Sequence, residues 1–227
     1  MARGRHHRIH AQDRLHRNRQ RVAQEAARLM SEHGIRDFHH AKLKAAERMG
    51  VVDEQSLPRN REIEQALRER QRIFHGHEQP QALRRRREAA REAMGFLARF
   101  EPRLVGAVLD GTADHHSAVC LHLFCDDPDA VPHFLRERGI PCEVLSRRLR
   151  ENRERTVEYP VYRFQADELP FDLTVFPRDA LRQAPLGRID DRPMQRASLS
   201  AVDELLTRPE PVTDPGFEDM LAGALGR

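Results

Sequence analysis

The chain has 227 residues, of which 39% are hydrophobic and 33% charged, and its formal net charge is +3. A chain of this length can bury a substantial core, and its apolar fraction is too high for an intrinsically disordered protein. No run approaches about 18 consecutive apolar residues, so a membrane-spanning helix is not expected. A cytoplasmic protein that does not bind a membrane is therefore predicted. The three cysteines, an odd number, are expected to be reduced thiols.

Charge and residue type change together near residue 100. Residues 1–100 contain 23 Lys and Arg against 13 Asp and Glu, a balance of +10, whereas residues 101–227 contain 16 against 23, a balance of −7. The first part is rich in Arg, Ala and Glu, and the second has β-branched runs, prolines and turns. We therefore predict a basic α-helical module over residues 1–100 and a second domain over residues 101–227.

Helices are expected throughout the basic module. Apolar residues at three- and four-residue intervals predict helices at about 12–33, 37–49 and 80–100, and another that begins between residues 56 and 60. Residues 1–11, rich in Arg and His, are expected to be a disordered tail. The apolar faces are narrow and rich in Ala, so these helices need to pack in a bundle or against the second domain.

A run of four arginines, Arg84, Arg85, Arg86 and Arg87, lies in the last of these helices. Four consecutive helical positions cover about 300° of arc, so they cannot form one flat patch. One interpretation is a solvated helix face whose side-chain stems cover apolar surface. The other is contact with the phosphates of an RNA or a nucleotide. The sequence leaves both interpretations open.

The second domain is expected to combine strands with helices in an α+β fold. A helix is predicted after the second strand and another near residues 198–206, and residues after about 207 form a Pro-rich tail. The layout predicts a mixed β-sheet with helices packed against it. Strands are predicted at about 103–109, 118–124 and within 141–150, followed by a hairpin turned at 166–168.

Three short segments of this domain follow a recognisable pattern. The first is VLDGT, Val108 to Thr112, the second is SAVCLHLF, Ser117 to Phe124, and the third is PFDLTVF, which contains Asp172. Their order resembles the signature of the nucleotidyltransferase superfamily, which has the polymerase-β-like fold. In that signature an apolar strand and a Gly-Ser or Gly-Thr pair precede a strand with the rhythm Ser-Asp-apolar-Asp. The resemblance covers about residues 101–180.

The resemblance implies a mode of nucleotide binding. Gly111, Thr112 and Ser117 fall where backbone amides and a hydroxyl would approach the triphosphate. Nucleotidyl transfer uses two Mg²⁺ ions held by carboxylates, because Mg²⁺ prefers hard oxygen ligands. Two acids that are two residues apart on a strand lie on the same side and can share these ions. A third acid on a neighbouring strand completes the metal site.

The sequence departs from the signature at the metal site. The two acidic positions hold Ala118, which offers no ligand, and Cys120, whose sulfur is a poor ligand for Mg²⁺. Asp172 is retained at the third position, and it is either a weak catalytic candidate or an ordinary strand residue facing solvent. No metal site is therefore predicted, and Mg²⁺ is expected as a cofactor only if the protein is active.

Other chemistries were considered on the residues present. His115 and His116 could contact a phosphate, or they could lie in an exposed turn. Cys120 and His122 share a strand face as a zinc pair would, but Cys125 lies on the other face and no second ligand pair follows. A P-loop is excluded because no Gly-rich loop precedes either lysine of the chain.

The sequence thus favours a nucleotidyltransferase-like protein that is catalytically degenerate and binds a nucleotide or RNA. One alternative is an active enzyme that uses rearranged acids, such as Asp110 or Asp126 with Asp172. A second alternative is a protein–protein adaptor, because charge-rich helices also serve that role.

Overall fold

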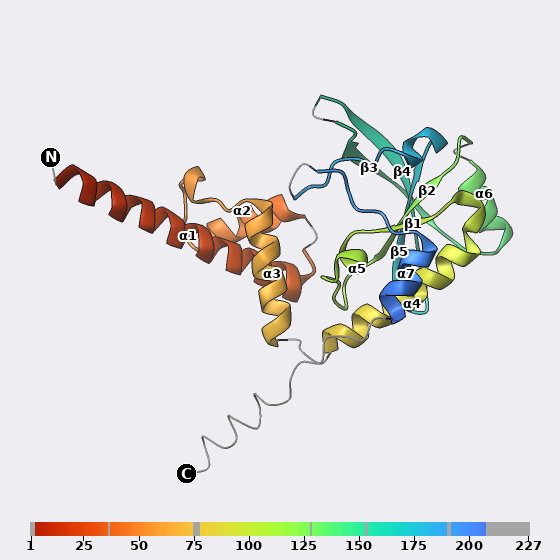
Figure 1. The fold of residues 1–227 in the computed structure, drawn as a ribbon, viewed down its shortest axis with the longest axis horizontal. Helices are drawn as coiled ribbons and strands as arrows, with labels where there is room; N and C mark the ends of the chain where they lie inside the picture. Colours follow the sequence, from red (N-terminus) through yellow and green to blue (C-terminus); the bar gives the residue numbers. More distant parts are fainter. Residues whose placement is uncertain are drawn as a thin grey trace, which may run out of the picture.

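The computed structural model describes residues 3–35, 37–74, 78–127, 129–152, 154–189 and 192–207. It confirms an α+β fold in which helices accompany one mixed five-stranded sheet (Figure 1). The Pro-rich tail expected after residue 207 lies outside the described residues. The elements are α1 (Arg3–His33), α2 (Phe38–Arg48), η1 (Glu54–Ser56), α3 (Asn60–Phe74), α4 (Glu78–Phe96), η2 (Ala98–Phe100), β1 (Arg103–Val105), α5 (Ala107–Asp110), β2 (Val119–Phe124), α6 (Ala130–Glu137), β3 (Glu143–Arg150), β4 (Thr156–Ala166), β5 (Leu169–Phe176), η3 (Arg178–Leu181) and α7 (Leu199–Thr207).

Helices α1, α2 and α3 form a small bundle beside the sheet (Figure 1). Small alanines on their facing sides let the helices approach closely, and Asp37 caps α2 by accepting a 2.8 Å hydrogen bond from the His40 amide. Helix α1 begins at Arg3, so it includes most of the segment expected to be a disordered tail. The buried core of the bundle consists of Val22, Ala23, Ala26, Leu29, Ala41, Ala45, Ala46 and Ile63.

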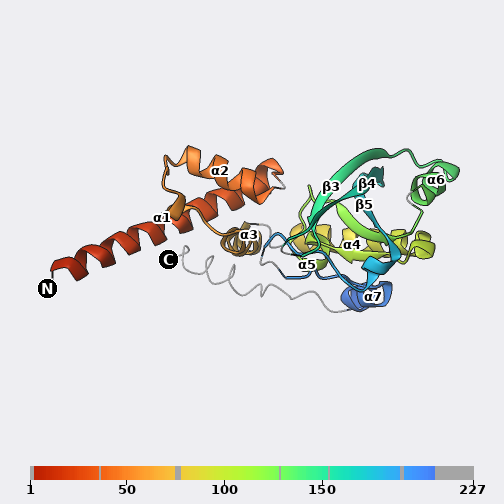
Figure 2. The same cartoon turned by 90° about the horizontal axis from the view of Figure 1, so that it is seen from above.

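Helix α4 belongs to a different core from the bundle. Its buried residues Leu83, Ala90 and Met94 share one apolar cluster with the sheet and with residues of α6 and α7. Figure 2 shows α4 and α7 running along the sheet, away from α1. The domain division near residue 100 stays a prediction, but α4, which precedes that residue, contributes to the core of the sheet.

The sheet has the strand order β1-β2-β5-β4-β3. Strand β2 pairs parallel with β5, and the other neighbouring pairs are antiparallel. The strands predicted at 103–109, 118–124 and in the hairpin therefore lie in one sheet, as expected. The hairpin turns at Asp167 and Glu168, which both have positive φ, as a tight two-residue turn requires.

The predicted strand 103–109 is wrong in its second half. Strand β1 ends at Val105, and residues 107–110 form the short helix α5. Gly106 separates the two with φ of 71° and ψ of −153°, a conformation that side-chain-bearing residues rarely adopt. A short apolar run is compatible with either a strand or a buried helical turn, so periodicity alone could not resolve this point.

Alternation along the strands gives the sheet two different faces. We call the face that packs against α4, α6 and α7 the covered face, and it presents residues such as Leu121 and Leu173. The opposite side, the polar face, carries the alternate residues of the same strands. Its members on β2 to β5 are Cys120, His122, Phe124, Glu143, Arg147, Tyr159, Arg163, Asp172, Thr174 and Phe176, together with the apolar Leu145, Leu149, Val157 and Val161.

Candidate functional site

Asp172 lies where the sequence analysis expects it, beside the two positions that lack acids. The parallel register of β2 and β5 pairs Asp172 directly with Cys120, and Ala118 precedes β2 by one residue. Ala118 is 6% exposed and offers only a methyl group. Among the described residues, no group of three His, Cys, Asp or Glu side chains could hold a metal ion. The fold thus places Asp172 beside Cys120 and near Ala118, and the described residues form no set of metal ligands there.

Two arginines hold the Asp172 carboxylate on the polar face. Arg147 Nη2 donates to Oδ2 at 2.9 Å, and Arg163 Nε donates to Oδ1 at 2.9 Å. Asp172 is only 1% exposed, so the alternative that it faces solvent is wrong. Burial by itself would raise the pKa of Asp172, but the hydrogen bonds and charges of Arg163 and Arg147 outweigh it and leave the pKa below its ordinary value. Asp172 is therefore a buried, ionised acid whose charge is neutralised by arginine.

A second polar pair lies on the polar face at His122, two residues after Cys120 on β2, where Arg196 from the segment before α7 contacts it. His122, 1% exposed, accepts a 3.1 Å hydrogen bond at Nδ1 from Arg196 Nε. Burial, followed by the nearby charges of Arg196 and Arg147, lowers the pKa of His122 to about 3, so its ring is neutral. A neutral ring that accepts at Nδ1 carries its proton on Nε2, so His122 is a potential hydrogen-bond donor on this face in addition to the arginines.

Arg196 is a largely buried cation held by aromatic rings. Its guanidinium carbon lies 4.9 Å from the centroid of the Phe124 ring and 5.2 Å from that of Phe176. Its Nη1 donates to the Ala180 carbonyl at 2.7 Å. Burial and then repulsion from Arg103 lower the pKa of Arg196 to about 10. These contacts attach the segment before α7 to the sheet, and they add positive charge to the polar face.

The loop that carries the expected nucleotide-binding residues is closed by its own hydrogen bonds. Ser117 Oγ donates to Asp114 Oδ1 at 2.9 Å and accepts from the Asp114 amide at 3.0 Å. Gly111 ends α5 with φ of 77°, and the Thr112 amide donates to the Ala107 carbonyl at 2.9 Å. Ser117 therefore shapes the loop, and its hydroxyl is already committed to Asp114.

The glycine that directly follows a strand is Gly106 and not Gly111. The resemblance places the Gly-Ser or Gly-Thr pair at the end of the first apolar strand, and in the structure that position holds Gly106 and Ala107. Gly111 and Thr112 come one helical turn later. The misplacement follows from the overlong strand that the sequence predicted, and the hydroxyl expected at this point is replaced by the methyl group of Ala107.

The two loop histidines are exposed and lie close to the helical bundle. The His115 and His116 rings are 3.9 Å apart between centroids. A Cβ added to Gly34, at the end of α1, would lie 3.6 Å from Cγ of His116. These histidines thus lie where the loop approaches the bundle.

Arg86 attaches α4 to this loop. It is 4% exposed, and its Nε donates to the Ser117 carbonyl at 2.9 Å while Nη2 donates to the His115 carbonyl at 2.8 Å. Its Nη1 also donates to the Ala82 carbonyl at 3.1 Å. A buried guanidinium with three backbone acceptors holds the loop in place, so a phosphate contact is not its role in this structure.

The other three arginines of the run diverge, as the helical arc requires. Arg85 Nη2 donates to the Asp167 carbonyl at 2.8 Å, in the β4–β5 turn. Arg87 Nε donates to the Val108 carbonyl of α5 at 3.3 Å. Arg84 is exposed and pairs with Glu88 one turn away. Arg84 to Arg87 therefore reach different parts of the molecule and form no common phosphate-binding surface.

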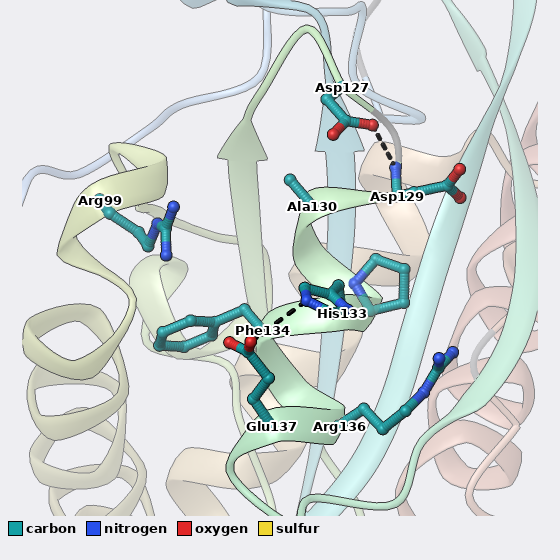
Figure 3. Close-up of a pocket in the computed structure, with 9 residues that line it drawn as sticks. Arg99, Asp127, Asp129, Ala130, His133, Phe134, Arg136 and Glu137 are labelled. Atoms are coloured by element: carbon teal, nitrogen blue, oxygen red, sulfur yellow. Dashed lines mark hydrogen bonds and ion pairs between the residues drawn. The ribbon is translucent and has the colours of Figure 1, made fainter.

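A shallow hollow of about 530 Å³ lies elsewhere, along α6 (Figure 3). His133 and Glu137 pair across one turn of α6 at 3.1 Å, and the Asp129 amide donates to Asp127 Oδ1 at 3.0 Å. These two contacts each join residues of the same helix or of the turn before it. Its lining residues are Arg99, Asp127, Asp129, Ala130, Pro132, His133, Phe134, Arg136 and Glu137.

A scan against models of known protein families gives no match, and searches of curated proteins and of solved structures give no significant match. None of the helices in the described ranges combines the length and the apolar character that crossing a bilayer requires.

Proposed function

We propose that the sheet and its helices form a nucleotidyltransferase-like domain that binds a nucleotide through its phosphates and does not transfer it. The observation that carries this proposal is the register of Asp172 with Cys120, together with the two arginines on its carboxylate. A retained third acid in the middle of a parallel strand pair supports the resemblance. Its neutralisation by Arg147 and Arg163 supports the loss of metal-dependent chemistry.

The polar face has the charge that an anionic ligand needs. Register and contacts place four arginines on it or at its edge, against the buried Asp172, the exposed Glu143, and Glu151, which accepts a hydrogen bond from Tyr159. The side chains of Arg147 and Arg163 are 28% and 40% exposed, so parts of both guanidinium groups are accessible. Arginine binds phosphate through paired N–H donors, and here it supplies the positive charge that Mg²⁺ would bring to the phosphates.

The geometry argues against an active site made from rearranged acids. Asp126 follows β2 and accepts a 3.0 Å hydrogen bond from the Arg178 amide. It lies six residues beyond Cys120, the partner of Asp172, which is a distance of about 20 Å in an extended chain. Asp110 ends α5, and its pKa is raised by burial and by Glu64 of α3. Neither acid approaches Asp172 in a way that two shared metal ions require.

Calorimetric titration with the four ribonucleoside triphosphates, in excess Mg²⁺ and in EDTA, tests the binding. We expect binding of at least one triphosphate that does not depend on Mg²⁺. Arg147→Gln should weaken it, and Arg148→Gln is the matched control, because the adjacent residue points to the other face of β3. Equal losses in the two variants would contradict the polar face as the binding site.

Incubation with labelled triphosphates and protein, sugar or RNA acceptors tests the absence of transfer. We expect no Mg²⁺-dependent turnover. Turnover that Asp172→Asn abolishes would show that the protein is an active enzyme. If no triphosphate binds in either titration, the proposal fails and the protein–protein adaptor becomes the better explanation.

A further inference from the structure

Helix α1 consists of a packed part and a projecting part. Among residues 14–33, whose burial the structure describes, the buried ones fall between Val22 and Ser31, where α2 and α3 pack against the helix. No residue from Arg14 to Arg21 is buried. Figures 1 and 2 show this N-terminal part of α1 extending beyond the other two helices. We call residues 3–21 the basic arm.

The sequence of the arm carries a large net positive charge. Residues 3–21 contain seven arginines and one acidic residue, a balance of +6, whereas residues 22–33 contain Arg28 against two glutamates, a balance of −1. Arg28 of the packed part bonds to both glutamates, at 2.7 Å each. The charge of the arm therefore has no counterpart within its own helix.

Three arginines of the arm form an exposed stripe. Arg14, Arg17 and Arg21 are spaced by three and four residues, so they fall within about 60° of one another around the helix. All three are exposed, and none is in an ion pair with another described residue. Arg19, on another side, donates to the Gln55 carbonyl at 2.6 Å and helps attach η1 to α1. The stripe is thus directed away from the bundle.

The composition of the arm favours one kind of negatively charged partner over others. Its apolar residues are Ile9, Ala11 and Leu15, too few for the apolar face with which an amphipathic helix enters a membrane surface. It contains no Phe, Tyr or Trp on which the bases of a single strand could stack. What remains is a helical segment with seven arginines in its sequence, about 28 Å long at 1.5 Å per residue, a length and charge suited to the regular phosphate array of a duplex.

We propose that the basic arm binds the phosphate backbone of a nucleic-acid duplex, without reading its sequence. A helix is narrow enough to lie in or along the major groove of B-DNA, and arginines can contact phosphates on its border. Residues 14–21, none of which is buried, gain little stability from packing, and contact with phosphates would supply a partner for their arginines. This site is separate from the polar face, so it does not rest on the proposed function.

Fluorescence anisotropy with the full chain tests the inference, using labelled DNA and RNA duplexes of about 20 base pairs, long enough to span the arm, and single strands of the same sequences. We expect the affinity for a duplex to fall steeply between about 50 and 200 mM salt. Replacing Arg14, Arg17 and Arg21 by Gln removes three phosphate contacts, so the slope of log K against log salt should decrease by about 2.7, at about 0.9 per contact. The affinity at low salt should fall at least about tenfold.

The matched control changes the same amount of charge elsewhere. Arg91, Arg136 and Arg182 are exposed and lie outside α1, and their triple replacement by Gln should leave the slope within about 0.5 of the wild type. Circular dichroism of both variants checks that the helices are retained. Equal slopes in the two triple variants would overturn the proposal. So would single strands bound as tightly as duplexes, or binding to polyglutamate but to no duplex.

Discussion

The two faces of the sheet are built from the same strands and are both buried along β2 and β5, but they are stabilised differently. On β2 and β5 the covered face presents Leu121 and Leu173, each 0% exposed, and the polar face presents His122 and Asp172, each 1% exposed. Apolar side chains on the covered face need only complementary shape from α4, α6 and α7. The buried polar groups need specific donors, because an unpaired buried charge is strongly unfavourable.

The donors of the polar face come from distant parts of the chain. Asp172 is neutralised from β3 and β4, and His122 is bonded by Arg196 from the segment before α7. The covered face therefore accepts different apolar side chains as long as their volume fits. The polar face instead requires particular charges and hydrogen-bond partners. The difference shows that buried polar groups can hold the centre of a sheet face while the arginines that pair with them stay partly exposed at its border.

The largest effect is expected from a cavity on the covered face. Leu173→Ala should lower the free energy of unfolding by about 2–5 kcal/mol, because the fully buried side chain is lost and its neighbours relax only in part. Urea denaturation measures the change. Leu43→Ala on α2 is the control, since Leu43 is 47% exposed and its removal should have a small effect. A loss below about 1 kcal/mol at Leu173 would mean that the covered face is not tightly packed.

A smaller effect is expected from removing the charge on the polar face. Asp172→Asn keeps the size of the side chain but loses its charge-assisted hydrogen bonds, which should lower the free energy of unfolding by about 1–3 kcal/mol. Arg147 and Arg163 are partly exposed and can regain water, which limits the loss. Asp179→Asn, at an exposed acid, is the control. A free energy of unfolding equal to that of the wild type in the Asp172→Asn variant would show that the two ion pairs contribute nothing.

The His122 site should appear in the pH dependence of stability. The pKa of His122 is lowered from 6.5 to about 3, so below pH 6.5 the unfolded chain binds a proton that the folded chain does not. Its contribution to stability is complete above pH 6.5 and is lost as the pH falls toward 3, by up to about 1.4 kcal/mol per pH unit. Denaturant titrations at several pH values should show this slope in the wild type and a flatter profile in His122→Asn. His133→Asn, at an exposed histidine, should keep the wild-type slope; parallel profiles for all three proteins would refute the assignment.

The elements with strong local signals could be predicted from the sequence. Alternation identified β2 and β5, and the turn residues identified the hairpin at Asp167 and Glu168. The same reasoning extended β1 through the apolar residues 107–110, because a buried helical turn and a strand look alike over four residues. That error displaced the expected glycine from Gly106 to Gly111.

The candidate site was predictable only for residues that lie within short segments with a recognisable sequence pattern. Asp172 and Cys120 came from recognisable segments, and their pairing is confirmed by the register. Arg147, Arg163 and Arg196 were missed, since their role depends on which strands pair and in what register, and an arginine in a strand has no local signal for its partner. Arg84 to Arg87 look alike in sequence, but only the three-dimensional direction of each side chain distinguishes buried Arg86 from exposed Arg84.

The smallest effect is expected at the border of the polar face, where one arginine faces two acids. Arg163 contacts the buried Asp172 at 2.9 Å and also lies 3.9 Å from Glu143, whose side chain is 61% exposed. Water screens the outer pair, so Glu143→Gln should change the free energy of unfolding by no more than about 0.5 kcal/mol, measured by urea denaturation. The double variant with Asp172→Asn should show nearly additive changes, because Glu143 remains hydrated whether or not Arg163 keeps its inner partner. A loss at Glu143 as large as that at Asp172 would mean that burial is not what separates the two acids, and the contrast between the faces would then need another cause.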